Sequence, residues 1–256
     1  MPFVELPRGK IFVAQRGAGS PPIVCIHGAG GLHQHWGAIL RTLGDTTHTL
    51  LPDLPGHGRS DPPGCQRIVD YSNVIQQVMD ALALDKVILA GHSMGGAIAL
   101  QTALETPRRV RGLVLVATGA KLGVAPRFIE ALEDTPDDGI DLIVDAAYSA
   151  YATLAMRKAG LAGFRSLNPQ TYINDLHACH AFDIRERLSE VTCPVLVIGG
   201  EDDQMAPPRF SHYLHEHLAN SELVMLRHAG HMLPIEKPAE VGAAIRSWFV
   251  ARYRNA

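Results

Sequence analysis

The feature that most constrains the fold is a run of small and apolar residues from Val87 to Leu100, with one serine near its centre. Its first four residues are Val-Ile-Leu-Ala, typical of a strand buried on both faces, and the residues from Ala97 to Leu104 continue as a helix. Ser93 stands at the junction between Gly91 and Gly95, which favours a strained strand-to-helix turn that exposes the hydroxyl. The run therefore predicts an α/β fold with a nucleophile at the end of a strand.

The same serine could have a structural role instead of a catalytic one. Serine is a favoured N-cap residue, so Ser93 could simply begin the helix that follows it. The motif alone does not separate the two roles. The nucleophile is favoured because the other residues that a hydrolytic site needs follow later predicted strands.

The composition fits one domain with an insertion. The 256 residues are 46% hydrophobic and 19% charged, as in ordinary globular proteins, and the net charge of -3 gives no basic footprint for a nucleic acid. The apolar runs are too short to span a bilayer, and the first residues lack the features of a signal peptide, so we expect a cytoplasmic protein without a membrane partner. The four cysteines have no paired spacing and predict free thiols.

Apolar periodicity predicts an alternation of strands and helices. The expected strands cover residues 11–15, 23–26, 48–52, 86–90, 110–117, 195–198 and 222–226, and a last helix begins at Pro238. Such an alternation predicts a mostly parallel, twisted sheet with helices on both faces.

The pattern changes between residues 121 and 188, where strand-like runs disappear and prolines and glycines interrupt helical segments. This stretch is far longer than the helix that a crossover between parallel strands needs. We therefore expect a small helical cap, residues 121–188, inserted into a core of residues 1–120 and 189–256. The alternative is a bundle of crossover helices that does not face the substrate.

Two loops follow predicted strands at the edge where open α/β sheets bind ligands. The first, His27-Gly28-Ala29-Gly30-Gly31, allows backbone N–H groups to point into a crevice. A phosphate or dinucleotide loop is the alternative, but the G-x-G-x-x-G spacing and a P-loop lysine are missing. In the second loop, residues 53–60, we expect Asp53 and Arg59 to brace the turn.

Together these features resemble the α/β-hydrolase fold over essentially the whole chain. The elbow at residues 91–95, an acidic cluster at 201–203 and His231 follow the family's chain order of nucleophile, acid and histidine. The loop at 27–31 is similar to the family's oxyanion loop. The resemblance implies a sheet of about eight strands with the cap inserted after the sixth. Serine at the elbow argues against the haloalkane dehalogenase and epoxide hydrolase branches, whose nucleophile is aspartate.

The resemblance also implies the catalytic roles. A serine hydroxyl is a weak nucleophile, so an imidazole must take its proton and a carboxylate must orient that imidazole. Ser93 is then the nucleophile and His231 the general base, whereas His228 matches the family's pattern less well. The family's acid stands four residues before a proline, which favours Asp203 over Asp202. For the oxyanion hole, the resemblance implies two backbone N–H donors, those of Ala29 and Met94.

Four further residues are expected to line the substrate pocket. His27 and His92 flank the predicted oxyanion loop and nucleophile, and His177 and Cys179 lie near the end of the cap. A zinc or redox site formed by His177, Cys179 and His180 is the alternative, but this cluster lacks a fourth ligand. We expect no cofactor and no metal.

The sequence thus predicts a carboxylesterase-like serine hydrolase that acts on small esters, as a monomer or a homodimer. Cleavage of a carbon–carbon bond or a lactone by the same triad is the first alternative. The carbon–carbon reaction on acidic dienones would call for an arginine in the cap, and Arg127, Arg157 and Arg165 lack a recognisable context. The second alternative is a small-molecule receptor with vestigial turnover, which an intact triad disfavours.

Overall fold

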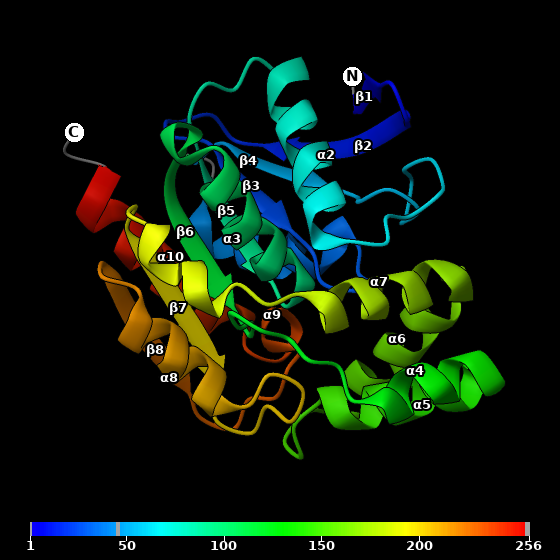
Figure 1. The fold of residues 1–256 in the computed structure, drawn as a ribbon. Helices are drawn as coiled ribbons and strands as arrows, with labels where there is room; N and C mark the ends of the chain where they lie inside the picture. Colours follow the sequence, from blue (N-terminus) through cyan, green and yellow to red (C-terminus); the bar gives the residue numbers. More distant parts are fainter. Residues whose placement is uncertain (1, 45–46, 254–256) are drawn as a thin grey trace.

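The computed structural model describes residues 2–44 and 47–253 (Figure 1). Within these residues, eight strands form one sheet in the order β1-β2-β4-β3-β5-β6-β7-β8. The strands are β1 (Phe3–Leu6), β2 (Gly9–Arg16), β3 (Ile23–Ile26), β4 (Thr49–Pro52), β5 (Val87–His92), β6 (Val110–Val116), β7 (Val195–Gly200) and β8 (Ser221–Leu226). From β4 to β8 every neighbouring pair is parallel, whereas β2 is antiparallel to both β1 and β4. The predicted mostly parallel sheet is therefore confirmed.

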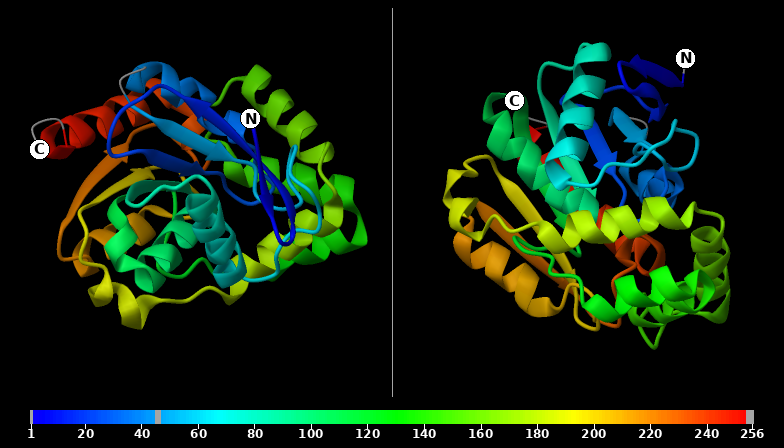
Figure 2. Two further views of the ribbon diagram at one scale, coloured as in Figure 1. Left: turned by 90° about the horizontal axis from the view of Figure 1, so that it is seen from above. Right: turned by 45° about the vertical axis from the view of Figure 1, so that its right-hand side comes forward.

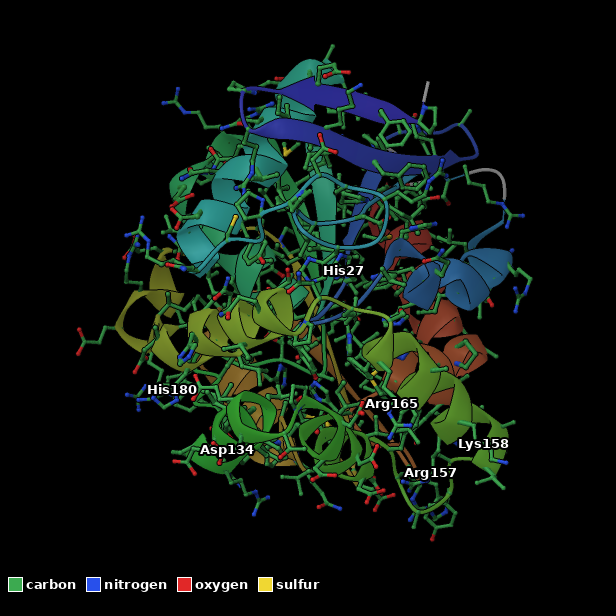
Figure 3. All side chains as sticks on the ribbon, turned by 90° about the vertical axis from the view of Figure 1, so that its right-hand side faces the viewer. His27, Asp134, Arg157, Lys158, Arg165 and His180 are labelled. Carbon is green, nitrogen blue, oxygen red and sulfur yellow. The ribbon has the colours of Figure 1, made fainter. Side chains whose placement is uncertain are left out.

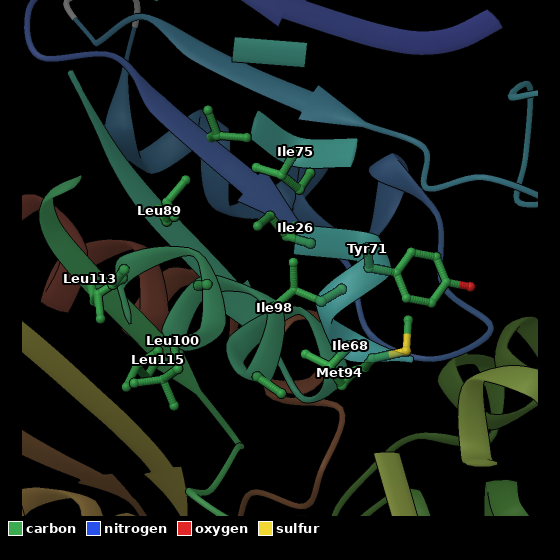
Figure 4. Close-up of a cluster of buried hydrophobic side chains, with 14 of the residues drawn as sticks. Ile26, Ile68, Tyr71, Ile75, Leu89, Met94, Ile98, Leu100, Leu113 and Leu115 are labelled. Atoms are coloured by element: carbon green, nitrogen blue, oxygen red, sulfur yellow. The ribbon is translucent and has the colours of Figure 1, made fainter. Parts of the chain in front are cut away.

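Helices cover both faces of the sheet (Figure 2). One face packs against α1 (Gly37–Leu43) and α10 (Pro238–Tyr253), and the other against α2 (Ile68–Ala81), α3 (Met94–Glu105) and α8 (Pro208–His217). Alternate residues of the central strands pack on opposite faces of the sheet, because successive side chains of a strand point in opposite directions. In β5, Val87 and Leu89 belong to the α2–α3 cluster that Figure 4 shows, and Ile88 and Ala90 to the opposite one.

The first strand is the one element of the sheet for which the sequence gives no prediction. β1 has four residues, of which only Val4 is buried, so it carries no apolar run that could reveal it. It pairs with β2 as the outer arm of a hairpin at the edge of the sheet.

Between β6 and β7 the chain forms α4 (Pro126–Asp134), α5 (Pro136–Ala147), α6 (Leu154–Arg165) and α7 (Pro169–Ala181). We call residues 121–188 the helical segment; it lies at the end of the sheet toward which the parallel strands point (Figures 1 and 2). Its helices share an apolar cluster of their own, to which the core contributes Met232. Lys121 and Asp183 form a single antiparallel bridge and an ion pair of 3.2 Å, so the segment leaves and re-enters the core at one point.

The described helices include none that is both long enough and apolar enough to cross a membrane.

Candidate active site

The turn between β5 and α3 holds Ser93 in a strained conformation. Its φ of 53° and ψ of −118° lie outside the regions that a residue with a side chain normally adopts. A Cβ at Gly91 would come within 2.1 Å of the Gly95 carbonyl oxygen, and a Cβ at Gly95 within 2.3 Å of the Ile26 carbonyl oxygen. Only glycine fits either position, so both glycines are required for a turn this tight.

Ser93, His231 and Asp203 form a continuous hydrogen-bond chain. The Ser93 hydroxyl lies 2.8 Å from His231 Nε2, and His231 Nδ1 lies 2.9 Å from Asp203 Oδ2. With Nδ1–H donating to the carboxylate, Nε2 presents a lone pair to the hydroxyl. The arrangement suits transfer of the serine proton to the imidazole.

The carboxylate at this site belongs to Asp203, whose side chain is completely buried. Its other oxygen, Oδ1, accepts the backbone N–H groups of Met205 at 2.9 Å and Ala206 at 2.8 Å. Asp202 is exposed instead. His228 is exposed as well, and its ring lies against that of Tyr151 with centroids 4.0 Å apart. Neither alternative therefore takes part in the chain.

The loop that carries His231 is held from two sides. The His231 N–H donates to the Ala147 carbonyl at the end of α5 at 2.8 Å, and His92 Nε2–H donates to the His231 carbonyl at 2.8 Å. Burial, followed by the charge that His231 would carry, lowers the pKa of His92 well below its usual value. His92 is thus a neutral ring that fixes the backbone of its neighbour.

A cavity of about 240 Å³ lies above Ser93 and His231. The core contributes Gly28, Ala29, His92 and Met232 to its lining, and the helical segment contributes a mainly apolar wall. That wall includes Leu122, Val124, Phe128, Ile143, Phe164, Tyr172, Leu176 and Cys179. A second cavity of about 170 Å³ shares His35, Phe164 and Met232 with the first, so these side chains separate two neighbouring spaces.

The two proposed oxyanion donors, Ala29 and Met94, differ in their surroundings. Ala29 lines the cavity, whereas the Met94 side chain is buried among the residues of the α2–α3 cluster (Figure 4). Only the backbone of Met94, the first residue of α3, is therefore suited to face the substrate. The N-terminus of a helix favours a developing negative charge.

The structure places two of the four expected pocket residues at the cavity and two elsewhere. His92 and Cys179 line it. His27 does not: it is fully buried, accepts the Leu54 N–H at 3.0 Å through Nε2 and donates to the Gly28 carbonyl at 2.8 Å (Figure 3). His177 does not line it either, because its half-exposed ring points to Glu133, 3.5 Å away. The expectation for these two histidines is wrong.

The alternative of a metal cluster near the end of the helical segment also lacks the geometry. Cys179 faces the cavity, whereas His180 lies at the outside of the segment (Figure 3) and pairs with the Val124 carbonyl at 2.8 Å. Among the described residues, no group of three or more His, Cys, Asp or Glu side chains is placed to hold a metal ion.

Two polar residues of the cavity lining, His35 and Arg209, were not named as candidates from the sequence. His35 lines both cavities, and burial lowers its pKa to about 4 against the opposing effect of Asp53. Arg127 and Arg209 also line the main cavity, and both are exposed. The sequence analysis considered Arg127 only as an arginine for carbon–carbon cleavage and did not consider Arg209, since each is a single arginine at the start of a helix. Asp53, by contrast, braces its loop as predicted, accepting the N–H groups of His33 and Arg59.

By its fold and by this geometry the protein is an α/β protein with a serine–histidine–aspartate hydrogen-bond chain next to a helical segment. Comparison with known proteins shows the family to which it belongs. The model of the Alpha/beta hydrolase family matches residues 23–244, and the chain belongs to that family. The predicted resemblance is confirmed.

Individual relatives fit the same picture. The chain is 31% identical over 248 residues to a pimeloyl-[acyl-carrier protein] methyl ester esterase of Neisseria meningitidis, which covers 89% of this chain and 93% of the relative. A solved structure described as "Est816 as an N-Acyl homoserine lactone degrading enzyme" superposes with a TM-score of 0.88 at 28% identity, over 96% of this chain and 100% of that one. A thermophilic esterase gives a TM-score of 0.85 at 27% identity, over 97% and 96%.

Proposed function

We propose that this protein is a serine hydrolase that cleaves small carboxylic esters through an acyl-enzyme. The observation that carries the proposal is the hydrogen-bond chain Ser93–His231–Asp203 at the floor of an apolar cavity. The similarity to an ester hydrolase and to a thermophilic esterase supports the same reaction.

The proposed reaction has two halves. Ser93 Oγ attacks the ester carbonyl while its proton passes to His231 Nε2, and the negative oxygen of the tetrahedral intermediate accepts the N–H groups of Ala29 and Met94. The intermediate collapses, the C–O bond breaks, and His231 returns the proton to the leaving alcohol. Water then attacks the acyl-enzyme by the same route and releases the carboxylic acid and free Ser93.

The cavity supports a small and largely apolar substrate. Its volume of about 240 Å³ is below the roughly 300 Å³ at which pockets for drug-sized ligands begin. We further propose that the helical segment, residues 121–188, acts as the cap that supplies the apolar wall. Lactones are the second candidate substrates, because a lactone is a cyclic ester and the similar structure at 28% identity is described as a lactone-degrading enzyme.

The test is hydrolysis of p-nitrophenyl esters of increasing acyl length by the wild type and by Ser93→Ala, with a fluorophosphonate as covalent probe. We expect turnover of short esters, labelling of Ser93, and loss of both in the variant. Simple lactones assayed in parallel distinguish the second candidate.

Two results would contradict the proposal. Ester turnover that persists in Ser93→Ala would show that another group does the chemistry. Labelling of Ser93 without turnover of any ester or lactone would instead favour carbon–carbon cleavage or a receptor.

A further inference from the structure

A second buried polar cluster lies behind the oxyanion loop. At its centre is the carboxylate of Asp175 on α7, which has no solvent exposure. Its Oδ2 accepts the Gly30 N–H at 2.9 Å and His57 Nε2–H at 2.8 Å, and its Oδ1 accepts the Tyr71 hydroxyl at 2.5 Å. One carboxylate of the helical segment thus joins three separate parts of the core.

The partner from α2 is directed toward this point by packing. Tyr71 is fully buried, and Figure 4 shows its ring at the margin of the apolar cluster with the hydroxyl pointing away from Ile26, Ile75 and Ile98. A buried hydroxyl needs a partner, and Asp175 supplies it.

The His57 ring carries a positive charge in this arrangement. Its Nε2 faces the Asp175 carboxylate, and its Nδ1 faces the Pro55 carbonyl at 3.0 Å. Both oxygens can only accept, so both nitrogens carry a proton. Burial is the largest single influence and lowers the pKa of His57, but the charge and hydrogen bond of Asp175, the Pro55 carbonyl and Asp53 together outweigh it, and the pKa lies above its usual value. The charged ring therefore compensates the buried carboxylate and keeps it an acceptor.

The Asp175–Gly30 hydrogen bond lies next to the proposed oxyanion donor. Gly30 has a φ of +60°, and the Gly31 N–H donates to the Gly28 carbonyl at 2.9 Å, which closes a turn around Ala29. The bond to Asp175 fixes the peptide group that joins Ala29 to Gly30. Together the two hydrogen bonds leave Ala29 little freedom to rotate its own N–H.

Close packing holds the same turn against the helical segment. A Cβ at Gly30 would lie 3.0 Å from side-chain atoms of both Leu167 and Tyr172. The turn therefore has no room to move toward Leu167 and Tyr172, and a shift away from α7 would break the bond to Asp175.

We propose that Asp175 is a positioning residue for the oxyanion hole, which accepts the Gly30 N–H and thereby holds the Ala29 N–H toward the ester carbonyl. The inference rests on the proposed function. Asp175 is absent from the cavity lining, so it acts through Gly30 and not on the substrate. Because the full negative charge on the carbonyl oxygen exists only after attack, this positioning affects kcat more than KM.

The principal test is Asp175→Asn, which keeps the size of the side chain but replaces one acceptor oxygen by a donor. Kinetics on p-nitrophenyl butyrate are expressed per active site titrated with a fluorophosphonate, so unfolded protein does not count. Removal of one oxyanion donor costs about 10²–10³-fold in kcat, so we expect displacement of that donor to lower kcat about 10–100-fold, with KM within about threefold.

Two other variants serve as comparisons. Asp141→Asn makes the same change on α5 of the helical segment, at an exposed carboxylate paired with Arg165, and should behave as the wild type. Tyr71→Phe removes only the bond to Oδ1 and leaves the Gly30 contact, so we expect a smaller effect than that of Asp175→Asn.

A second readout separates positioning from general damage. A trifluoromethyl ketone adds to Ser93 and places an oxyanion in the same hole. Its Ki should rise in Asp175→Asn by about the factor by which kcat/KM falls. A kcat per titrated site or a Ki equal to the wild-type value would overturn the inference.

Hydrogen exchange on the wild type provides a test that needs no folded variant. If Asp175→Asn does not fold, the Gly30 amide proton of the wild type should still be protected from exchange, and a freely exchanging amide would overturn the inference. Failure of the proposed function looks different: the wild type then shows no ester or lactone turnover, or its turnover persists in Ser93→Ala, and the inference falls with it. Wild-type activity with an unaffected Asp175→Asn overturns the inference alone.

Discussion

Two buried clusters of this protein contain a histidine, a carboxylate and a hydroxyl, and they differ in what each histidine faces. His231 lies between Asp203 and the Ser93 hydroxyl, which is itself a donor. His57 lies between Asp175 and the Pro55 carbonyl, both of which only accept. The first ring can hold a lone pair toward its neighbour, whereas the second must be protonated at both nitrogens.

The two clusters also differ in access. The cavity opens onto His231 and Ser93, whereas the side chains of His57 and Asp175 have no solvent exposure. The same residue types therefore form the proposed catalytic centre in one place and a closed structural contact in the other. Two features distinguish the clusters: the group that the imidazole faces besides the carboxylate, and the presence of a cavity.

The comparison is tested most strongly by His231→Gln. This change removes the proposed base, and by analogy with other serine hydrolases kcat should fall about 10⁵–10⁶-fold. Stability should change little, since the cavity leaves room for the new side chain. Ester kinetics and thermal unfolding measure the two effects, and a variant that retained a tenth of the wild-type kcat would remove His231 from the mechanism.

The matched change in the other cluster is His57→Gln, and we expect the opposite balance. The glutamine leaves the buried Asp175 carboxylate without its countercharge, and breaking a buried pair costs about 3–5 kcal/mol of unfolding free energy. Urea unfolding at pH 6.5 measures the loss. An undiminished stability would mean that the ring is not a cation in the folded protein.

The pH dependence of stability sharpens the comparison. The raised pKa of His57 gives a contribution that is fully present below about pH 6.5 and is lost as the pH rises through the folded-state value. The difference in stability between wild type and His57→Gln should therefore shrink toward alkaline pH. A difference that grew with pH would contradict this sign.

Two other buried histidines, His27 and His92, lower the stability of the folded protein as the pH falls. The pKa values of His27 and His92 lie well below the usual value, for both chiefly because of burial. They bind protons in the unfolded chain first, so each should cost the wild type about 1.4 kcal/mol between pH 7.5 and 5.5. Urea unfolding across this range checks it in His57→Gln, where the opposing contribution of His57 is absent, and the wild type should lose less stability than this variant.

The smallest effect is expected at Phe164, which separates the two cavities. Phe164→Leu should join them in part and raise kcat/KM for longer acyl chains relative to butyrate by a few fold, because one more buried methylene gains about 0.8 kcal/mol. A p-nitrophenyl ester series measures the shift. An unchanged chain-length profile would place the acyl group outside this wall.

Much of the sheet was predictable because its strands are buried on both faces. The strands β3, β5 and β7 begin with continuous apolar runs, and β6 has one from Leu113 to Val116, so these residues are expected only in a buried strand. The predicted roles of Ser93, Asp203 and His231 depended on chain order at the ends of these strands, and the fold brings the three together. The short edge strand β1 had no such signal.

Side-chain direction was less predictable than position. His27 and His177 were expected at the pocket because of their place in the chain, but the Leu54 N–H holds one ring and Glu133 attracts the other. Asp175 was overlooked because its partners come from three distant stretches. One signal existed: it is a lone charge among Tyr172, Leu176 and Cys179 at helical spacing, where an unpaired carboxylate could not be buried.

The bridge between Lys121 and Asp183 gives the helical segment a single stem. Because the two ends of the segment meet at this pair, the segment can be lengthened, shortened or exchanged without changing the register of the strands. In the cap role that we propose for the segment, such an exchange would change the wall of the cavity and leave Ser93, His231 and Asp203 in place. The hydrogen bond from the Gly30 N–H to Asp175 limits such an exchange. A replacement segment must supply another carboxylate at this point or leave the Gly30 N–H without an acceptor.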